Sequence, residues 1–592
     1  MNIFKDRFSE IKKASEPLYK SPKSVQETIE ILKISESGIF EVADGKYSKT
    51  YRFSDVNYAT RSEEEQESFF QRYCRCLNSF DCTFKITVNN KNKDMDVLRN
   101  EVMLKYRNDG FDKMRESYNR IIEEKILEGR QGIEQERYLT ITIERKNFEE
   151  AKAQFATIEA SMFRSFAELG SKLTPLTGNE RLKILHDYYR LGREDEFNFD
   201  IRQGRITGTD FRNEICNTRI KYHPDYFEDE GKVGRVLFIK KYPTYLSDRF
   251  FTELTFLPVH SVTSVDVVPV PKDLTMKMLQ KKYLGIESDI IKQQRTRNRN
   301  NDFSSDISYA TRQKKKDIEE IMNNVRENDE SLYYVSVTMI VMADDRDELE
   351  SICETVDSIA KGAGCAVDTC MYKQREAVNT TLPIGVRQIE TMRTMLTQSL
   401  AVLMPFNVQE LCDRNGIYYG VNQISKNIIV GNRKKLLNGN GFIFGVSGAG
   451  KSFQAKMEMG SVLLSTDDNV IAVDPMNEYE DVTEKYNGTY INISTNTRNY
   501  INPMDMDVWN LDVLDSKGWV RDKCQFMLSI CEQIMKEITP QQRSIISRCV
   551  KDLYMDIARS REKYVPTMED LYNRLLEQED KEARDVALGL EI

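Results

Sequence analysis

Residues 445–452, with the sequence GVSGAGKS, constrain this chain more than any other part of it. They fit the pattern G-x-x-x-x-G-K-[ST] and directly follow the short apolar run 441–444 (GFIF), which predicts a strand. Glycines let the backbone turn several N–H groups toward one phosphate without Cβ clashes. The residues predicted to bind phosphate are therefore Gly445, Val446, Ser447, Gly448, Ala449, Gly450, Lys451 and Ser452.

The residues at the end of this motif and just after it define the ligand further. In a loop of this kind Lys451 reaches the β- and γ-phosphates, and the hydroxyl of Ser452 ligates magnesium. The next residues predict a helix, because Phe453, Met457 and Leu464 fall on one helical face. The N-terminal end of a helix attracts anions. Strand, loop and helix in this order predict a nucleoside triphosphate site with ATP and Mg²⁺ as cofactors.

Two acidic residues downstream are candidates for the chemistry. Residues 469–474 (NVIAVD) predict a buried strand that ends at Asp474, and Glu478 follows in the next turn. If this is the Walker B strand, Asp474 supports the magnesium. If it is instead a neighbouring strand of a RecA-type sheet, the Walker B strand lies further on, and Glu478 at the sheet edge orients the attacking water. A plain helix-start carboxylate is the alternative for Glu478. Lys451 and Glu478 are the catalytic candidates, and Ser452 and Asp474 the metal candidates.

The N-terminal part of the chain shows the same plan twice. Residues 137–144 alternate as a strand does, and residues 148–169 then predict a long helix. Residues 331–343 predict a second strand, which is followed by a helix to Ala360. The repetition predicts a duplicated α+β module. The alternative is coincidence, because strand–helix pairs are common.

The segment that lies between these two strand–helix pairs is highly charged. Residues 271–330 predict a charged helical hairpin, and within it residues 292–316 carry eight Lys or Arg against two Asp. This segment is either a patch for nucleic acid or anionic lipid, or the solvated face of the hairpin, which we favour. The whole chain has a formal net charge of −9, so a uniformly basic nucleic-acid-binding surface is excluded.

Cysteine usage and hydropathy bear on the compartment. Cys74, Cys76 and Cys82 are close in sequence, but a metal site there needs a fourth ligand in a chain with three His. We favour reduced, buried thiols in a cytoplasmic protein. The N-terminus lacks the apolar segment of a signal peptide, and no apolar run approaches the roughly 20 residues of a spanning helix. We therefore expect no transmembrane segment.

Composition changes again near Thr381, where a turn at 383–385 precedes an expected amphipathic helix that stops near Pro405. The predicted fold class is α/β, with an N-terminal α+β region followed by a RecA-like P-loop NTPase domain that carries a helical insertion. The predicted domains are an α+β segment at 1–130, the duplicated module with its hairpin (about 271–330) at 131–380, and a partial P-loop ATPase domain at 381–592, with a helical subdomain at about 518–592.

Three short segments carry a family resemblance. GVSGAGKSFQAK, VDPMNEYE and INPMD (501–505) resemble the conjugative type IV secretion ATPases, the VirB-type motors (TraC/TraE/TrbE-like) of the HerA/FtsK-like P-loop superfamily. Residues 381–406 and 416–445 are also similar to that family, and the similarity is diffuse before 381. The resemblance implies a cytoplasmic ATPase that works as a homo-hexamer, peripheral at the inner face of the cell membrane. Its partners are membrane-embedded channel proteins, and direct contact with DNA stays open.

The chain departs from this family after Asp474, where no apolar run ends in Asp-Glu. Residues 518–591 predict helices, with a capping box at 539–542, and resemble the family's all-α insertion. No arginine finger is identifiable. We therefore expect a C-terminally truncated member that binds ATP and hydrolyses it very slowly. The alternatives are a nucleotide-binding structural subunit without turnover and a free DNA translocase, which would not require so large an N-terminal region.

Overall fold

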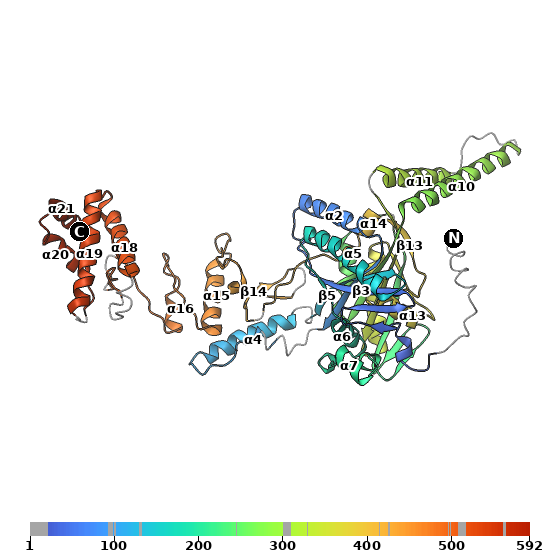
Figure 1. Cartoon of the computed structure of the whole chain (residues 1–592), viewed down its shortest axis with the longest axis horizontal. Helices are drawn as coiled ribbons and strands as arrows, with labels where there is room; N and C mark the ends of the chain where they lie inside the picture. Colours follow the sequence, from blue (N-terminus) through green and yellow to red (C-terminus); the bar gives the residue numbers. More distant parts are fainter. Residues whose placement is uncertain are drawn as a thin grey trace. The chain divides into compact units, whose positions relative to one another are not determined.

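The computed structural model divides into two compact units, Met1–Ala472 and Val473–Ile592. Figure 1 shows the chain coloured from its N-terminus to its C-terminus. The residues that the structure describes are 22–92, 99, 102–128, 133–243, 245–299, 309–327, 330–413, 415–423, 427–494, 497, 499–506, 517–560 and 564–591.

A large antiparallel sheet organises the first unit. Its strand order is β1-β2-β3-β5-β4-β10-β11-β9-β8-β7, and three short strands pair at its margins: β6 with β3, β12 with β9, and β13 with β11. The strands are β1 (Lys33–Ile34), β2 (Ile39–Ala43), β3 (Lys46–Phe53), β4 (Thr83–Asn92), β5 (Ile133–Glu144), β6 (Leu173–Pro175), β7 (Ile220–Tyr222), β8 (Phe227–Asp229), β9 (Lys232–Lys241), β10 (Ser261–Val270), β11 (Leu332–Ala343), β12 (Ala366–Thr369) and β13 (Arg393–Leu396).

The order of elements repeats on either side of the sheet centre, where β4 pairs with β10. In each half a helix precedes the central strand, a helical excursion joins it to its neighbour, and a second helix follows. The first half uses α2 (Glu63–Asn78), α4 (Asp112–Glu128) and α5 (Phe148–Leu169); the second uses α9 (Arg249–Thr255), α10 (Lys272–Arg299), α11 (Tyr309–Glu327) and α12 (Arg346–Gly362). This order is what a duplication would produce, and the duplication itself stays a prediction.

The two long helices of the repeats begin and end with the expected chemistry. The backbone N–H of Glu150 donates to Asn147 at 2.9 Å at the start of α5, and Gly170 ends this helix with φ +80°. The backbone N–H of Glu348 donates to Asp345 at 2.8 Å at the start of α12. Side-chain caps of this kind satisfy amides that have no intrahelical acceptor. The strands and helices predicted for 137–169 and 331–360 are confirmed.

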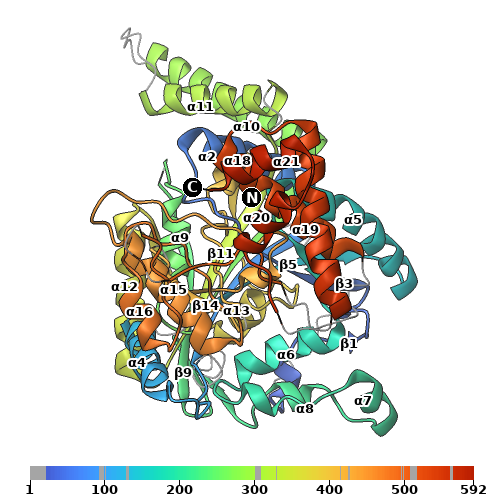
Figure 2. The same cartoon turned by 90° about the vertical axis from the view of Figure 1, so that its left-hand side faces the viewer.

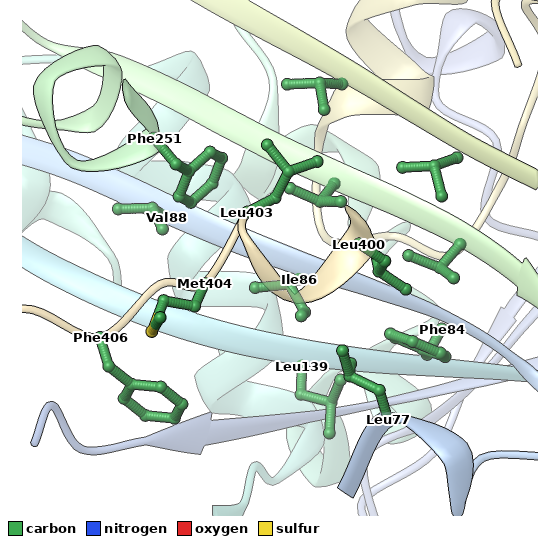
Figure 3. Packing of buried hydrophobic residues seen from close by; sticks show 14 of the residues in the cluster. Leu77, Phe84, Ile86, Val88, Leu139, Phe251, Leu400, Leu403, Met404 and Phe406 are labelled. Atoms are coloured by element: carbon green, nitrogen blue, oxygen red, sulfur yellow. The ribbon is translucent and has the colours of Figure 1, made fainter. Parts of the chain in front are cut away.

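One face of the sheet is apolar and buried beneath helices. Figure 3 shows strand residues Phe84, Ile86 and Leu139 packed with Leu77 of α2 and Leu400 of α14 (Thr397–Ala401). The same core takes in Phe251 and Phe406, both about 1% exposed. Burying a side chain of this size contributes about 1.5–3 kcal/mol.

The opposite face carries buried polar side chains and is crossed by residues 380–387, which we call the strap. The hydroxyls of Ser48 and Thr142 donate to strap carbonyls of Ile384 and Gly385, at 2.6 and 3.0 Å. Lys85, which is fully buried, donates to strap carbonyls as well, and burial lowers its pKa to about 8. The carbonyls of Ile384, Gly385 and Val386 are thus satisfied outside regular secondary structure.

The strap confirms the predicted turn at 383–385 but not the amphipathic helix expected after it. Residues 386–392 have no regular structure, and the short β13 and α14 follow. The reason is that Arg387 pairs with Asp266 of β10 through both Nε and Nη2, each at 2.8 Å. These contacts hold the segment extended on the sheet, where a helix would bond the Val386 carbonyl to its own backbone and take an acceptor from the buried Lys85 amine.

The second excursion, α10 and α11, is the helical hairpin predicted for 271–330. The two helices lie side by side in Figures 1 and 2, and Lys315 of α11 pairs with Glu287 of α10 at 3.0 Å. Several of its basic residues are exposed, namely Lys292, Arg295, Arg312, Lys314 and Lys316. The rest of the predicted basic segment, residues 300–308, lies outside the described residues.

The second unit consists mainly of helices: α16 (Glu480–Lys485), α18 (Lys517–Met535), α19 (Pro540–Ser560), α20 (Met568–Leu576) and α21 (Lys581–Gly589). The last four enclose a core that includes Met527, Tyr554 and Leu571. The backbone N–H of Gln542 donates to Thr539 at 3.3 Å, and that of Thr539 donates to Gln542 at 2.9 Å. The helices and the capping box predicted for 518–591 are confirmed.

Candidate phosphate-binding site

The glycine-rich loop leads directly into α15 (Lys451–Ser465), so the predicted loop and helix are confirmed. Gly448 and Gly450 have φ of +80° and +87°, which other residues adopt only with strain. Gly450 is the N-cap residue and provides no side-chain cap. The first amides of α15 have no intrahelical acceptor, so their N–H groups are available to an anion at an exposed helix start.

Lys451 curls back over the loop. Its Nζ donates to the carbonyls of Gly445 and Val446, both at 2.9 Å. A Cβ on Gly445 would lie 3.2 Å from Ala449 Cβ and from Lys451 Cγ, so the loop is narrow at its base. The amine is therefore held beside the loop, where it can exchange two carbonyl acceptors for phosphate oxygens.

The strand predicted for 441–444 is not formed. Phe442 and Phe444 are 83% and 87% exposed, and their rings stack on each other at 5.7 Å. The strand predicted for 469–474 is also not formed, and Ile471 and Val473 are 93% and 92% exposed. A strand needs a partner for its backbone groups, and neither segment pairs with another among the described residues. Two short strands do form nearby, β14 (Ile417–Val421) and β15 (Ile428–Gly431), and they pair with each other.

Asp474 and Glu478 lie in one turn. The carboxylate of Asp474 accepts hydrogen bonds from the backbone N–H of Met476 at 3.3 Å and of Tyr479 at 2.9 Å. Asp474 is half-buried, and Glu478 is exposed at the end of this turn, just before α16. Asp474 therefore fixes the turn that presents Glu478.

The predicted site residues divide between the two units. The loop 445–450, Lys451 and Ser452 belong to the first unit, and Asp474 and Glu478 belong to the second. The structure brings the eight loop residues together in one loop. The grouping of the two acids with Lys451 and Ser452 stays a prediction.

The residues present fit a magnesium–triphosphate group. Positive-φ glycines, an uncapped helix start and a lysine amine suit phosphate oxygens, and the Ser452 hydroxyl is an oxygen ligand of the kind that Mg²⁺ prefers. Among the described residues, three or more His, Cys, Asp or Glu side chains are nowhere grouped as a metal site needs. Burial raises the pKa of the Cys74 and Cys76 thiols to about 12.

Residues that sequence reasoning missed hold α15 in place. Glu458, in the middle of the helix, pairs with Arg433 at 2.8 Å and accepts from the Tyr419 hydroxyl of β14 at 2.9 Å. The C-terminal end of α15 contacts two arginines from residues 102–128, a segment far away in sequence. No spacing rule links Arg433 or residues 102–128 to the motif, so only the folded structure identifies them.

The glycine-rich loop and the helix that begins at Lys451 form a P-loop of the kind that NTPases use to bind phosphate. Comparison with family models agrees: residues 413–586 match the TraG P-loop domain. This region includes the loop, Asp474, Glu478 and most of the helices of the second unit. The match indicates a P-loop NTPase related to conjugative transfer. No curated protein matches the chain.

Proposed function

We propose that this chain is the ATP-binding motor subunit of a conjugative type IV secretion machine, of the VirB type. In this role ATP hydrolysis drives channel assembly or substrate transfer. The observation that carries the proposal is the uncapped, glycine-rich start of α15 with Lys451 folded over it, inside the region that matches the TraG P-loop domain.

Each site residue has a role in this proposal. The backbone N–H groups of 446–452 surround the phosphates, and Lys451 offsets their charge. Ser452 holds magnesium, with Asp474 supporting it. Glu478 orients the attacking water. Bound ATP supplies the phosphoanhydride that is cleaved.

Partners and location follow from the resemblance and the family match together. We propose a homo-hexamer at the inner face of the cell membrane, in contact with the membrane-embedded channel proteins. Within the described part of the chain, none of the helices has the length and apolar character needed to span a bilayer. On the α10–α11 hairpin, the basic side chains of Arg295, Lys314 and Lys316 are exposed to solvent.

The test of nucleotide binding is titration calorimetry with Mg-ATP. Lys451→Ala removes a charged donor, typically worth about 1.5–3 kcal/mol, and we expect at least a roughly ten-fold loss of affinity. Lys485→Ala, at an exposed lysine of α16, is the matched control and should bind as the wild type does. Equal affinity in the wild type and Lys451→Ala would refute the assignment of the loop.

Phosphate release separates the motor from its alternatives. We expect slow turnover by this chain, and Glu478→Gln should lower it about 100-fold while ATP affinity is kept, because general-base assistance is lost. ATP binding without any release would favour the structural subunit. Turnover that rises with added DNA and no membrane complex would favour a free translocase.

A further inference from the structure

Residues 102–128, which we call the arm, leave and return to the same strand ladder. They lie in sequence between β4 and β5, which pair with each other out to Asn92 and Ile133. A tight turn would be enough to join such strands. The arm instead contributes α4, which lies beside β14 and α15 in Figure 1.

The arm forms a small apolar core with the β14–β15 hairpin. Tyr118, Ile122 and Ile126 of α4 are buried together with Val430 of β15. The backbone N–H of Tyr418 in β14 also donates to the Tyr118 hydroxyl at 3.4 Å. The hairpin that holds the middle of α15 is thus itself held by the arm.

Two arginines of the arm bind the C-terminal end of α15. Arg107 donates to the Ser465 carbonyl at 2.7 Å and pairs with Asp467 at 2.7 Å. Arg115, which is fully buried, donates through Nε to the Leu464 carbonyl at 3.1 Å. Its other nitrogens are fixed by Asp109 and Asp112, at 2.6 and 2.8 Å.

These contacts satisfy groups that a helix end leaves open. The last carbonyls of a helix have no intrahelical donor, and the C-terminal end carries partial negative charge. Two guanidinium groups meet both needs. The opposite end of the same helix begins at Lys451, so the arm anchors one end of the helix whose other end forms the phosphate site.

We propose that the arm is a clamp on α15 and that Arg107 and Arg115 are positioning residues for nucleotide binding. This inference rests on the proposed nucleotide site. Through the clamp, the excursion between β4 and β5 sets the position of α15 on the β14–β15 hairpin, and with it the position of the phosphate-binding loop at the start of α15. Release of the clamp lets α15 move and weakens nucleotide binding.

Calorimetric titration of Mg-ATP into the full chain tests the clamp. Arg107→Asp removes the cation from the helix end and places a carboxylate beside Asp467, and we expect ATP affinity to fall about two- to five-fold. The double variant Arg107→Asp/Asp467→Arg restores the ion pair with reversed polarity but not the hydrogen bond to the Ser465 carbonyl, and should recover part of the loss. Lys113→Asp, at an exposed position in the first turn of α4, is the control and should leave affinity unchanged.

Hydrogen exchange tests whether the arm is coupled to the nucleotide site. If the arm only stabilised the fold, Mg-ATP would not change the exchange rates of its amides. Coupling between two sites is reciprocal, so Mg-ATP should slow exchange of the α4 amides in the wild type and in Lys113→Asp. The effect should be lost in Arg107→Asp. If that variant does not fold, Asp467→Asn removes the same pair at a side chain that is 97% exposed, and should weaken binding about two-fold.

The possible outcomes distinguish failure of the clamp proposal from failure of the proposed nucleotide-binding function. ATP binding by the wild type with unchanged affinity in Arg107→Asp and Asp467→Asn overturns the clamp and leaves the nucleotide site standing. Failure of the wild type to bind ATP overturns the nucleotide site and the clamp with it.

Discussion

The large sheet and the segment around the phosphate loop carry similar sequence patterns but differ in structure. In the sheet, apolar residues such as Ile141 and Val265 are fully buried, and each strand has a hydrogen-bonded neighbour. Around the loop, Phe444 and Ile471 are about 90% exposed, in segments with no strand partner among the described residues. The apolar pattern of a segment therefore indicates a preference for strand conformation, whereas a strand forms only where the segment has a partner elsewhere in the chain.

The sharpest way to test this difference is a matched pair of truncations. Ile141→Ala empties a site in the core of the sheet and should cost about 2–5 kcal/mol of unfolding free energy. Ile471→Ala changes an exposed side chain and should cost less than about 0.5 kcal/mol. Denaturant unfolding followed by circular dichroism measures both. Equal losses would mean that residues 469–474 are buried as a strand in solution.

Two glycines with positive φ extend the comparison. A Cβ on Gly385, at φ +98°, would lie 2.6 Å from Ser48 Cβ in the sheet, so Gly385→Ala should cost about 2–4 kcal/mol. A Cβ on Gly448, at φ +80°, meets nothing within 4 Å, so Gly448→Ala should cost about 1 kcal/mol.

Thermal melts and ATP titration of both glycine variants check this prediction. We expect Gly385→Ala to lower the melting temperature and to keep ATP affinity. We expect Gly448→Ala to lower the melting temperature less and to weaken ATP binding, because its methyl group occupies space next to the phosphates. A fall in ATP affinity in Gly385→Ala alone would contradict the separation of the two regions.

The buried sheet should also be the source of pH sensitivity. Burial lowers the pKa of His260 to about 4, and neither ring nitrogen has a hydrogen-bond partner in the described structure. Below the ordinary pKa near 6.5 the unfolded chain takes up a proton that the folded chain does not, so stability falls as pH drops from about 6.5 to 4. Lys91, Asp187 and Lys232 also act on this ring.

At 1.36 kcal/mol per pKa unit, the loss from His260 at pH 5 is about 2 kcal/mol. His260→Met should remove it, so its unfolding free energy should vary less between pH 7 and about pH 5. Urea unfolding at both pH values makes the comparison. An equal fall in the wild type and in His260→Met would assign the pH sensitivity to other groups.

Much of the fold could be predicted from local sequence signals. Three residues mark helix ends, namely Asn147, Gly170 and Asp345. Their capping interactions involve only residues a few positions away, so the local sequence predicts them. The helix expected after Gly385 failed for a non-local reason, because Arg387 pairs with Asp266 on a strand 121 residues away. The strand order of the sheet depends on such distant pairings and was not predictable from the sequence.

The candidate site divides in the same way. The loop and the start of α15 were predicted because phosphate binding needs adjacent residues of fixed type. Arg107 and Arg115 were missed, because nothing near them in sequence points to a helix 349 residues away. The roles of Asp474 and Glu478 depend on how the second unit meets the first, and these roles stay predictions.

The most direct test of the account is hydrogen exchange of the loop amides with and without Mg-ATP, read by mass spectrometry. The account predicts that the amides of residues 446–452 exchange more slowly when ATP is bound, because their N–H groups donate to phosphate oxygens. It predicts a clearly smaller change in Lys451→Ala when the ATP concentration is set near the wild-type Kd. Protection that appears elsewhere and leaves the amides of residues 446–452 unchanged would contradict the assignment of this loop as the phosphate site.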